Sequence, residues 1–111
     1  MATISDEYMR LMLSNARTYS AVILKATPRR YEPGADNIVW EHGRRNFELR
    51  ASGDLAIVCP VTGEGEVRGI CIFNTDVEQT KKIMNDDPAI KAGLFTYDVF
   101  PCSSFPGDSL P

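Results

Sequence analysis

The sequence predicts an α+β fold in which a four-stranded antiparallel sheet carries two helices on one face. This is the ferredoxin-like plait of order β-α-β-β-α-β, here with an extra N-terminal helix. Four short apolar segments are typical of strands, two segments between them have helical periodicity, and prolines and glycines mark the boundaries. Two split β-α-β units in this order generate such a sheet. The length of 111 residues fits a single domain.

Residues 1–16 predict a helical extension to this domain. Ser5 is a suitable N-cap, and two acidic residues follow it in the first turn. We expect this extension to pack loosely or against a partner subunit. The domain itself spans residues 17–101. Prolines and small polar residues then predict an irregular tail over residues 102–111.

The first half of the domain predicts one strand and one long helix. Residues 18–26 are rich in β-branched and aromatic side chains, as strands are, and a loop with the turn signal Pro33-Gly34 follows. Helical periodicity extends over residues 36–52. Asp36 is expected to cap the start of this helix, and Gly53 suits the left-handed position just past its end.

The second half predicts a hairpin, a helix and a final strand. Residues 55–59 and 67–73 are apolar runs on either side of a Gly-rich turn, which favours an antiparallel hairpin. Asp76 begins a helix that Pro88 interrupts, and a further helical turn follows. Residues 94–100 then alternate like a strand.

The last predicted strand carries large apolar groups on both faces. Leu94 and Phe100 fall on one face, and Phe95 and Val99 on the other. The helices cover only one face of the sheet, and an exposed apolar face usually marks a partner surface. We therefore expect a homodimer in which two sheets meet face to face.

Composition narrows the classes of partner and cofactor. The chain is 43% hydrophobic and 24% charged, and its formal net charge of -3 argues against nucleic acid or an anionic membrane as partner. No apolar run approaches the ~20 residues that a membrane span needs. Cys59, Cys71 and Cys102 lack metal-ligand spacing and predict free thiols in a reducing compartment, so we expect a cytoplasmic protein. Neither a metal nor a nucleotide cofactor is expected, since no phosphate-binding loop follows a strand.

His42 is the only histidine and the main candidate for chemistry. A neutral imidazole can remove a proton next to a carbonyl and return it elsewhere, and a carboxylate on its other nitrogen improves this function. Asp87, held at a helix break by Pro88, is the candidate carboxylate, although the sequence does not separate it from Asp86. The alternatives are a histidine on a charged helix surface and an aspartate that serves only as a local cap.

Arginines beside His42 are candidates for binding the substrate. Arg44 and Arg45 lie within one helical turn of His42, and a guanidinium group recognises a carboxylate through two hydrogen bonds. One of the two is therefore expected to hold an anionic substrate. For each of them separately, a solvated surface charge is the alternative.

Aromatic residues offer further contacts to a substrate. Tyr19 and Tyr97 are expected on strands, where they would line a pocket between sheet and helix. Trp40 is a candidate for stacking on the substrate. Core packing is the favoured interpretation for Trp40 and for Phe47, which shares its helix face seven residues on.

Several of these residues resemble the YCII-related domain family. The resemblance rests on Trp40-Glu41-His42, Gly53-x-Leu55, the Asp87-Pro88 break and the run Lys91-Ala92-Gly93-Leu94-Phe95, and it covers residues 17–101. It implies a ferredoxin-like plait that pairs into a dimeric α+β barrel, akin to muconolactone isomerase. It also implies a small enzyme with a His–Asp pair, some members acting on chlorinated products of aromatic breakdown.

The chain departs from the family pattern after its second strand. Cys59-Pro60 stands where the family usually has Gly-Pro, and Thr62 or Glu64 where an Asp often follows. Together the residues predict a small cofactor-independent isomerase or lyase for a small anionic or aromatic-derived molecule. The alternative is a non-catalytic dimeric module that binds a small ligand or serves as an accessory subunit.

Overall fold

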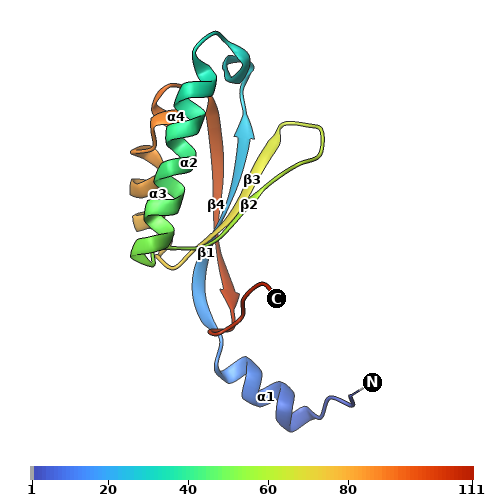
Figure 1. Cartoon of the computed structure of the whole chain (residues 1–111). Helices are drawn as coiled ribbons and strands as arrows, with labels where there is room; N and C mark the ends of the chain where they lie inside the picture. The colour runs from blue at the N-terminus through green and yellow to red at the C-terminus, as the bar shows by residue number, and fades with distance from the viewer. Residues whose placement is uncertain (1) are drawn as a thin grey trace.

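The computed structural model describes residues 2–111, so residue 1 of the predicted extension lies outside the described residues. The elements follow the predicted order (Figure 1). They are α1 (Asp6–Ser14), β1 (Arg17–Ala26), the 3-10 helix η1 (Pro28–Tyr31), α2 (Ala35–Ser52), β2 (Leu55–Pro60), β3 (Val67–Phe73), α3 (Val77–Asn85), α4 (Pro88–Lys91) and β4 (Phe95–Ser104). Within residues 2–111, no helix is both long and apolar enough to cross a membrane.

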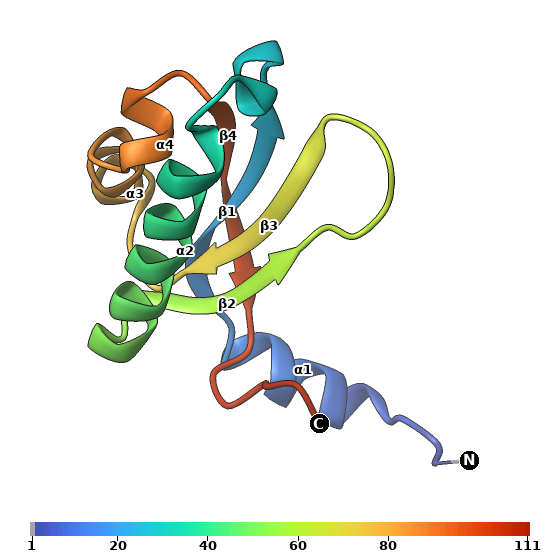
Figure 2. The ribbon, with the colours of Figure 1, turned by 45° about the horizontal axis from the view of Figure 1, so that its top comes forward.

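The sheet has the strand order β2-β3-β1-β4, and every neighbouring pair is antiparallel. The helices α2, α3 and α4 lie together on one side of it, as Figures 1 and 2 show. This arrangement is the ferredoxin-like plait that the sequence predicts, and the prediction of fold class is confirmed. In this topology α2 packs against β2, whereas α3 and α4 pack against β4.

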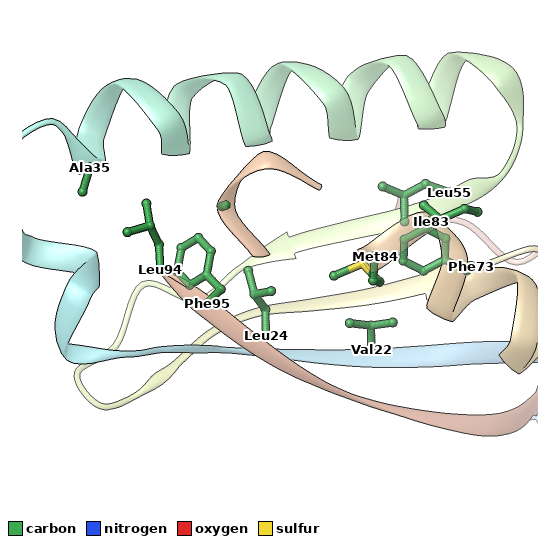
Figure 3. Packing of buried hydrophobic residues seen from close by; sticks show 10 residues of the cluster. Val22, Leu24, Ala35, Leu55, Phe73, Ile83, Met84, Leu94 and Phe95 are labelled. Carbon is green, nitrogen blue, oxygen red and sulfur yellow. The ribbon is translucent and has the colours of Figure 1, made fainter. Parts of the chain in front are cut away.

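The hydrophobic core lies between the sheet and the three helices α2, α3 and α4 (Figure 3). Alternate residues of β1, Val22 and Leu24 among them, point toward the helices and are buried. Figure 3 shows Leu94 and Phe95 near the start of α2 and Phe73 nearer its end. The complete buried cluster consists of Val22, Leu24, Ala35, Leu55, Phe73, Ile83, Met84, Ala89, Leu94 and Phe95.

Several predicted caps are confirmed. The Ser5 side chain accepts a hydrogen bond from the backbone N–H of Tyr8 at 3.1 Å, and Asp76 accepts one from that of Gln79 at 2.7 Å. Gly53 has a φ of 88° just past the end of α2, a conformation that favours glycine. These local interactions position the helix ends where the sequence predicts them.

The predicted cap of α2 is wrong. The helix begins at Ala35, one residue before the predicted start, and the N-cap is Gly34 with a φ of 85°. Asp36 therefore lies inside the first turn, where its Oδ1 accepts a hydrogen bond from Arg30 Nη1 at 2.8 Å and the two side chains form an ion pair. Its negative charge still suits the positive end of the helix.

The irregular tail begins later than predicted. The strand β4 continues through Ser104, so residues 102–104 are extended and pair with Arg17–Tyr19 of β1. Pro101 does not end the strand because β4 is at the edge of the sheet, where a missing N–H breaks no central ladder. The irregular segment is therefore residues 105–111.

The prediction that Trp40 and Phe47 pack in the core is also wrong for the single chain. Their exposed fractions are 70% and 64%. The face of α2 that meets the core instead includes Ala35, Ile38 and the polar His42. A search for apolar side chains overlooks a buried polar residue such as His42. The hydrophobic pattern therefore points to the face of α2 that carries Trp40 and Phe47, which is the exposed one.

The second face of the sheet is uncovered in the single chain. Ile23 of β1 lies opposite Ile70 and Asp98 and shares this face with Phe100. The exposed fractions are 43% for Ile70 and 49% for Phe100. The helix α1 projects beyond the sheet and the other helices, and none of its residues is buried in the described chain (Figure 1).

Candidate functional site

A cavity of about 950 Å³ is lined by α2, by the hairpin of β2 and β3, by parts of β1 and by the tail, so it reaches both faces of the sheet. Its helix wall includes Val39, His42 and Asn46, spaced so that they face the sheet along α2. Its strand wall includes Val58 and Gly69, and residues 104–110 line one part of it. The tail therefore contributes to the cavity, whereas α1 contributes no lining residue among those described.

The buried pair of His42 and Asp87 lies at this cavity. His42 Nδ1 is 2.8 Å from Asp87 Oδ2, and the exposed fractions of the two residues are 9% and 1%. His42 also packs on Phe95, with the ring centres 5.4 Å apart. The 18 residues of α2 hold His42 in place, while the start of α4 holds Asp87.

The two carboxylate oxygens of Asp87 have different partners. Oδ1 accepts hydrogen bonds from the backbone N–H groups of Ala89 at 2.8 Å and Ile90 at 3.4 Å, which cap α4. Oδ2 is thereby left to face His42. The capping role and the pairing role, which the sequence analysis treats as alternatives, therefore occur together in one side chain.

The structure separates Asp87 from its neighbour. Asp86 is exposed and forms an ion pair with Lys91 at 2.7 Å, and this contact lowers the pKa of Asp86. Asp86 thus lies on the solvent side of the helix break. Asp87 alone reaches His42.

The electrostatics of the pair favour an ionised Asp87. Burial raises the pKa of Asp87, but the hydrogen bond and charge of His42 and the backbone N–H groups of α4 outweigh it, so the pKa lies below its ordinary value. Arg45 Nη1, at 3.6 Å from Oδ2, adds a positive charge on another side. A carboxylate only accepts hydrogen bonds, so Nδ1 of a neutral His42 carries the proton and Nε2 keeps its lone pair.

Asn46 also belongs to this candidate site, although it is not among the residues predicted from the sequence. Its Nδ2 lies 3.4 Å from His42 Nε2, it is half-buried, and it lines the same cavity. Residues four apart on a helix share a face, so the spacing from His42 was a usable signal. The nitrogen of His42 that keeps its lone pair thus faces an amide donor at the cavity wall.

The predicted arginines do not line this cavity. Arg44 is on the outer side of α2, where it pairs with Glu41 at 3.1 Å. Arg45 is half-buried behind Asp87, and its Nη1 is buried without a hydrogen-bond partner in the described residues. Neither arginine faces the side of His42 that an incoming molecule would meet.

The three predicted aromatic residues, Trp40, Tyr97 and Tyr19, also lie in different places and do not gather around His42. Trp40 lines a second, outer groove of α2 together with Arg44 and Phe47. The Tyr97 hydroxyl donates to Asn85 Oδ1 at 2.8 Å and lines neither cavity. Tyr19 lines the large cavity, but it alternates with buried β1 residues and so points to the uncovered sheet face.

The cysteines do not form a reactive or metal-binding cluster in residues 2–111. All three are free, and no group of three or more metal-ligating side chains occurs there. Burial raises the pKa of the Cys71 thiol to about 11, so this thiol is protonated near neutral pH. The Cys71 thiol is therefore not a ready nucleophile in this cavity.

The sheet order and the layer of helices define a ferredoxin-like α+β fold with a buried His–Asp pair at its main cavity. Among solved structures, the chain is similar to 5-chloro-2-hydroxyhydroquinone dehydrochlorinase (TftG) from Burkholderia phenoliruptrix AC1100, in complex with 2,5-dihydroxybenzoquinone. The sequences are 16% identical, the match covers 74% of this chain and 90% of that one, and the TM-score is 0.52. At this identity the similarity shows the fold.

No protein-family model and no curated protein matches the chain. Membership of the YCII-related family therefore stays a prediction. The fold that the resemblance implies is present in the single chain, and the dimeric barrel is not tested by it.

Proposed function

We propose that the protein is a small cofactor-independent lyase or isomerase that uses His42 as its general acid and base. The observation that carries this proposal is the buried contact of His42 Nδ1 with Asp87 at 2.8 Å, beside a cavity of about 950 Å³. One nitrogen of the ring is oriented and the other keeps a lone pair. This is the arrangement that proton transfer requires.

The proposed step begins with proton abstraction at carbon. His42 Nε2 takes a proton from a carbon next to a carbonyl group, and the electron pair of the C–H bond moves onto the carbonyl oxygen. In a lyase this electron pair then expels a leaving group from the neighbouring carbon. In an isomerase His42 returns the proton to a different carbon. Asp87 stabilises the positively charged ring between these events.

The proposed substrate is a small molecule derived from an aromatic ring. Apolar side chains, including Val39, Val58 and Phe95, line the cavity and suit a flat ring. The similar dehydrochlorinase acts on a chlorinated hydroxyhydroquinone and was solved with a dihydroxyquinone. Its similarity makes hydroxylated quinonoid molecules the first class to test.

The decisive experiment compares His42→Gln with Glu41→Gln, a change at the exposed neighbouring position. Release of chloride from 5-chloro-2-hydroxyhydroquinone and binding of 2,5-dihydroxybenzoquinone are measured for both variants and the wild type. We expect His42→Gln to lose at least about 100-fold in kcat, since general acid–base catalysis contributes that much. Circular dichroism should be unchanged, and Glu41→Gln should retain activity.

Two outcomes would contradict the proposal. Full turnover by His42→Gln would exclude His42 as the acid and base. Binding of the quinone without turnover of this substrate or of related hydroxyquinones would favour the second class of function, a non-catalytic module for small ligands.

We further propose that the protein is a cytoplasmic homodimer whose uncovered sheet faces meet. Ile23, Ile70 and Phe100 give this face an apolar centre that water contacts in the single chain. Burial of such a surface stabilises association at ~25 cal/mol per Å² before the costs of association. The Lys25–Asp98 ion pair at 2.8 Å lies on the same face and would help to set the register.

Sedimentation equilibrium at micromolar concentration tests the dimer. We expect twice the chain mass of 12.3 kDa for the wild type. Ile70→Asp should shift the protein toward the monomer, whereas Glu48→Gln on the outer side of α2 should not. A monomeric wild type would overturn the proposal.

A further inference from the structure

Asn46 lies beside the ring nitrogen of His42 that Asp87 leaves free. Nδ1 is engaged by Asp87, so only Nε2 is available, and Asn46 Nδ2 lies 3.4 Å from it. Both side chains line the large cavity. Any substrate atom that approaches Nε2 closely enough to exchange a proton therefore comes within reach of the Asn46 amide.

The contact between Asn46 Nδ2 and His42 Nε2 is long for a hydrogen bond. Backbone-type N–H···O hydrogen bonds centre at about 2.9–3.0 Å, whereas this N···N distance is 3.4 Å. An amide that binds so weakly is readily released to another acceptor. A carbonyl oxygen on the substrate, next to the carbon that loses its proton, is such an acceptor.

We propose that Asn46 is a catalytic residue that donates a hydrogen bond from Nδ2 to the substrate oxygen on which negative charge develops. The inference rests on the proposed function of His42 and adds the group that stabilises the product of proton abstraction. As Nε2 takes the proton, the C–H electron pair moves onto that oxygen. The amide of Asn46 then interacts more strongly with it than with the neutral carbonyl.

The backbone of α2 holds Asn46 at a fixed position relative to His42. Asn46 lies within the 18-residue helix α2, one turn after His42, so the two side chains have a fixed spacing. The amide needs only to turn from Nε2 to an oxygen beside it, so little reorganisation is required when charge develops. The inference also restricts the substrate class to molecules with an oxygen beside the reacting carbon.

Two variants of Asn46 test the proposal. Asn46→Asp keeps the size of the side chain but has no donor near neutral pH, and Asn46→Leu removes all polarity. Glu48→Leu, an exposed change on the outer side of the same helix, is the matched control. We expect both Asn46 variants to lose about 100- to 1,000-fold in kcat, with KM changed by less than about threefold, because the donor acts on developing charge.

The ring of the single histidine provides a second measurement. In 15N-labelled protein, Asn46→Leu should move the Nε2 signal of His42 and leave the Nδ1 signal in place, whereas Glu48→Leu should move neither. A purely structural asparagine would move the Nε2 signal without lowering kcat, and that result would overturn the proposal. So would kcat within twofold of wild type in both Asn46 variants.

Failure of the proposed function is distinguishable from failure of this inference. If wild type and His42→Gln are equally inactive on all hydroxyquinone substrates, both proposals fall. If His42→Gln is inactive while Asn46→Asp and Asn46→Leu are active, only the role of Asn46 falls.

Discussion

The inner and outer faces of α2 differ in a way that hydrophobicity alone does not describe. The inner face presents His42 to the core, where burial and a carboxylate partner restrict the ring to one arrangement. The outer face presents Trp40 and Phe47, which are large and apolar yet exposed. The candidate site therefore lies on the side of α2 where neighbouring groups restrict the side chains, and the more apolar side of the helix is the exposed one.

The same contrast holds for the adjacent arginines. Arg44 forms an exposed ion pair with Glu41, whereas Arg45 lies behind the buried carboxylate of Asp87. Neighbours in sequence thus have unequal consequences for stability. Variants on each side of α2 can measure the difference.

The largest loss of stability is expected when Asp87, the carboxylate that contacts His42 on the inner face of α2, is removed. Asp87→Ala deletes the cap of α4 and leaves His42 and Arg45 without their anion. Breaking a buried ion pair costs about 3–5 kcal/mol, and this is the loss of unfolding free energy that we expect. Urea denaturation followed by circular dichroism measures it.

Asp86→Asn is the control for that change. It removes an exposed ion pair, which solvent screens, and should cost far less stability than Asp87→Ala. Equal losses for the two variants would show that burial does not distinguish these aspartates.

Lowering the pH should remove part of the free energy of unfolding that Asp87 contributes. The pKa of Asp87 is below its ordinary value of 3.8 in the folded protein, so the unfolded chain takes up its proton first as the pH falls. The contribution of Asp87 to stability is therefore complete well above pH ~4 and is lost as the pH falls through the folded pKa.

Denaturation curves between pH 6 and 2 for wild type and Asp87→Asn measure this contribution. The wild type should lose more stability over this range than the variant, in which the group no longer titrates. Parallel curves would contradict the expected linkage.

A smaller effect is expected from the arginine behind Asp87. Arg45→Met should reduce the free energy of unfolding by about 1–2 kcal/mol, because the buried carboxylate loses a nearby positive charge. KM should stay within about twofold, since Arg45 does not line the cavity. Arg44→Met, on the outer face, should lower stability by less than about 1 kcal/mol.

Steady-state kinetics and denaturation of both arginine variants sharpen the comparison. A large rise in KM for Arg45→Met would restore the substrate-binding role that its place beside His42 in the sequence suggests. A rise for Arg44→Met would point to the outer groove instead.

The smallest effect is expected on the outer face itself. Trp40→Ala should change the free energy of unfolding by about 0.5 kcal/mol or less, as is usual for surface positions. Phe73→Ala in the core should cost about 3–5 kcal/mol in the same measurement. A loss above about 2 kcal/mol for Trp40→Ala would mean that a partner covers this face in solution.

Most of the fold could be predicted because its signals are local. The caps at Ser5 and Asp76, the glycine after α2 and the alternation in β4 each depend on a few consecutive residues. The element order then restricts the sheet to few topologies. The errors arose where a non-local contact decided the outcome: β4 continues past Pro101 because β1 offers it a partner strand.

Local signals in the sequence predicted only part of the candidate site. The sequence identified His42 as the single histidine and placed two aspartates before Pro88, yet it offered no means to choose between them. The choice depends on which carboxylate the turn into α4 directs inward, and on the 2.8 Å contact that results. Asn46 carried only the signal of its spacing from His42.

Local propensity and periodicity therefore specified the helices, the strands and their order. Tertiary packing alone decided which side of α2 is buried, which aspartate meets His42, and that Arg45 supports the pair from behind. The physical reason is that backbone structure responds to neighbours along the chain, whereas the burial and pairing of a polar side chain depend on groups that only folding brings together. For His42 and Asp87, 45 positions separate the two partners.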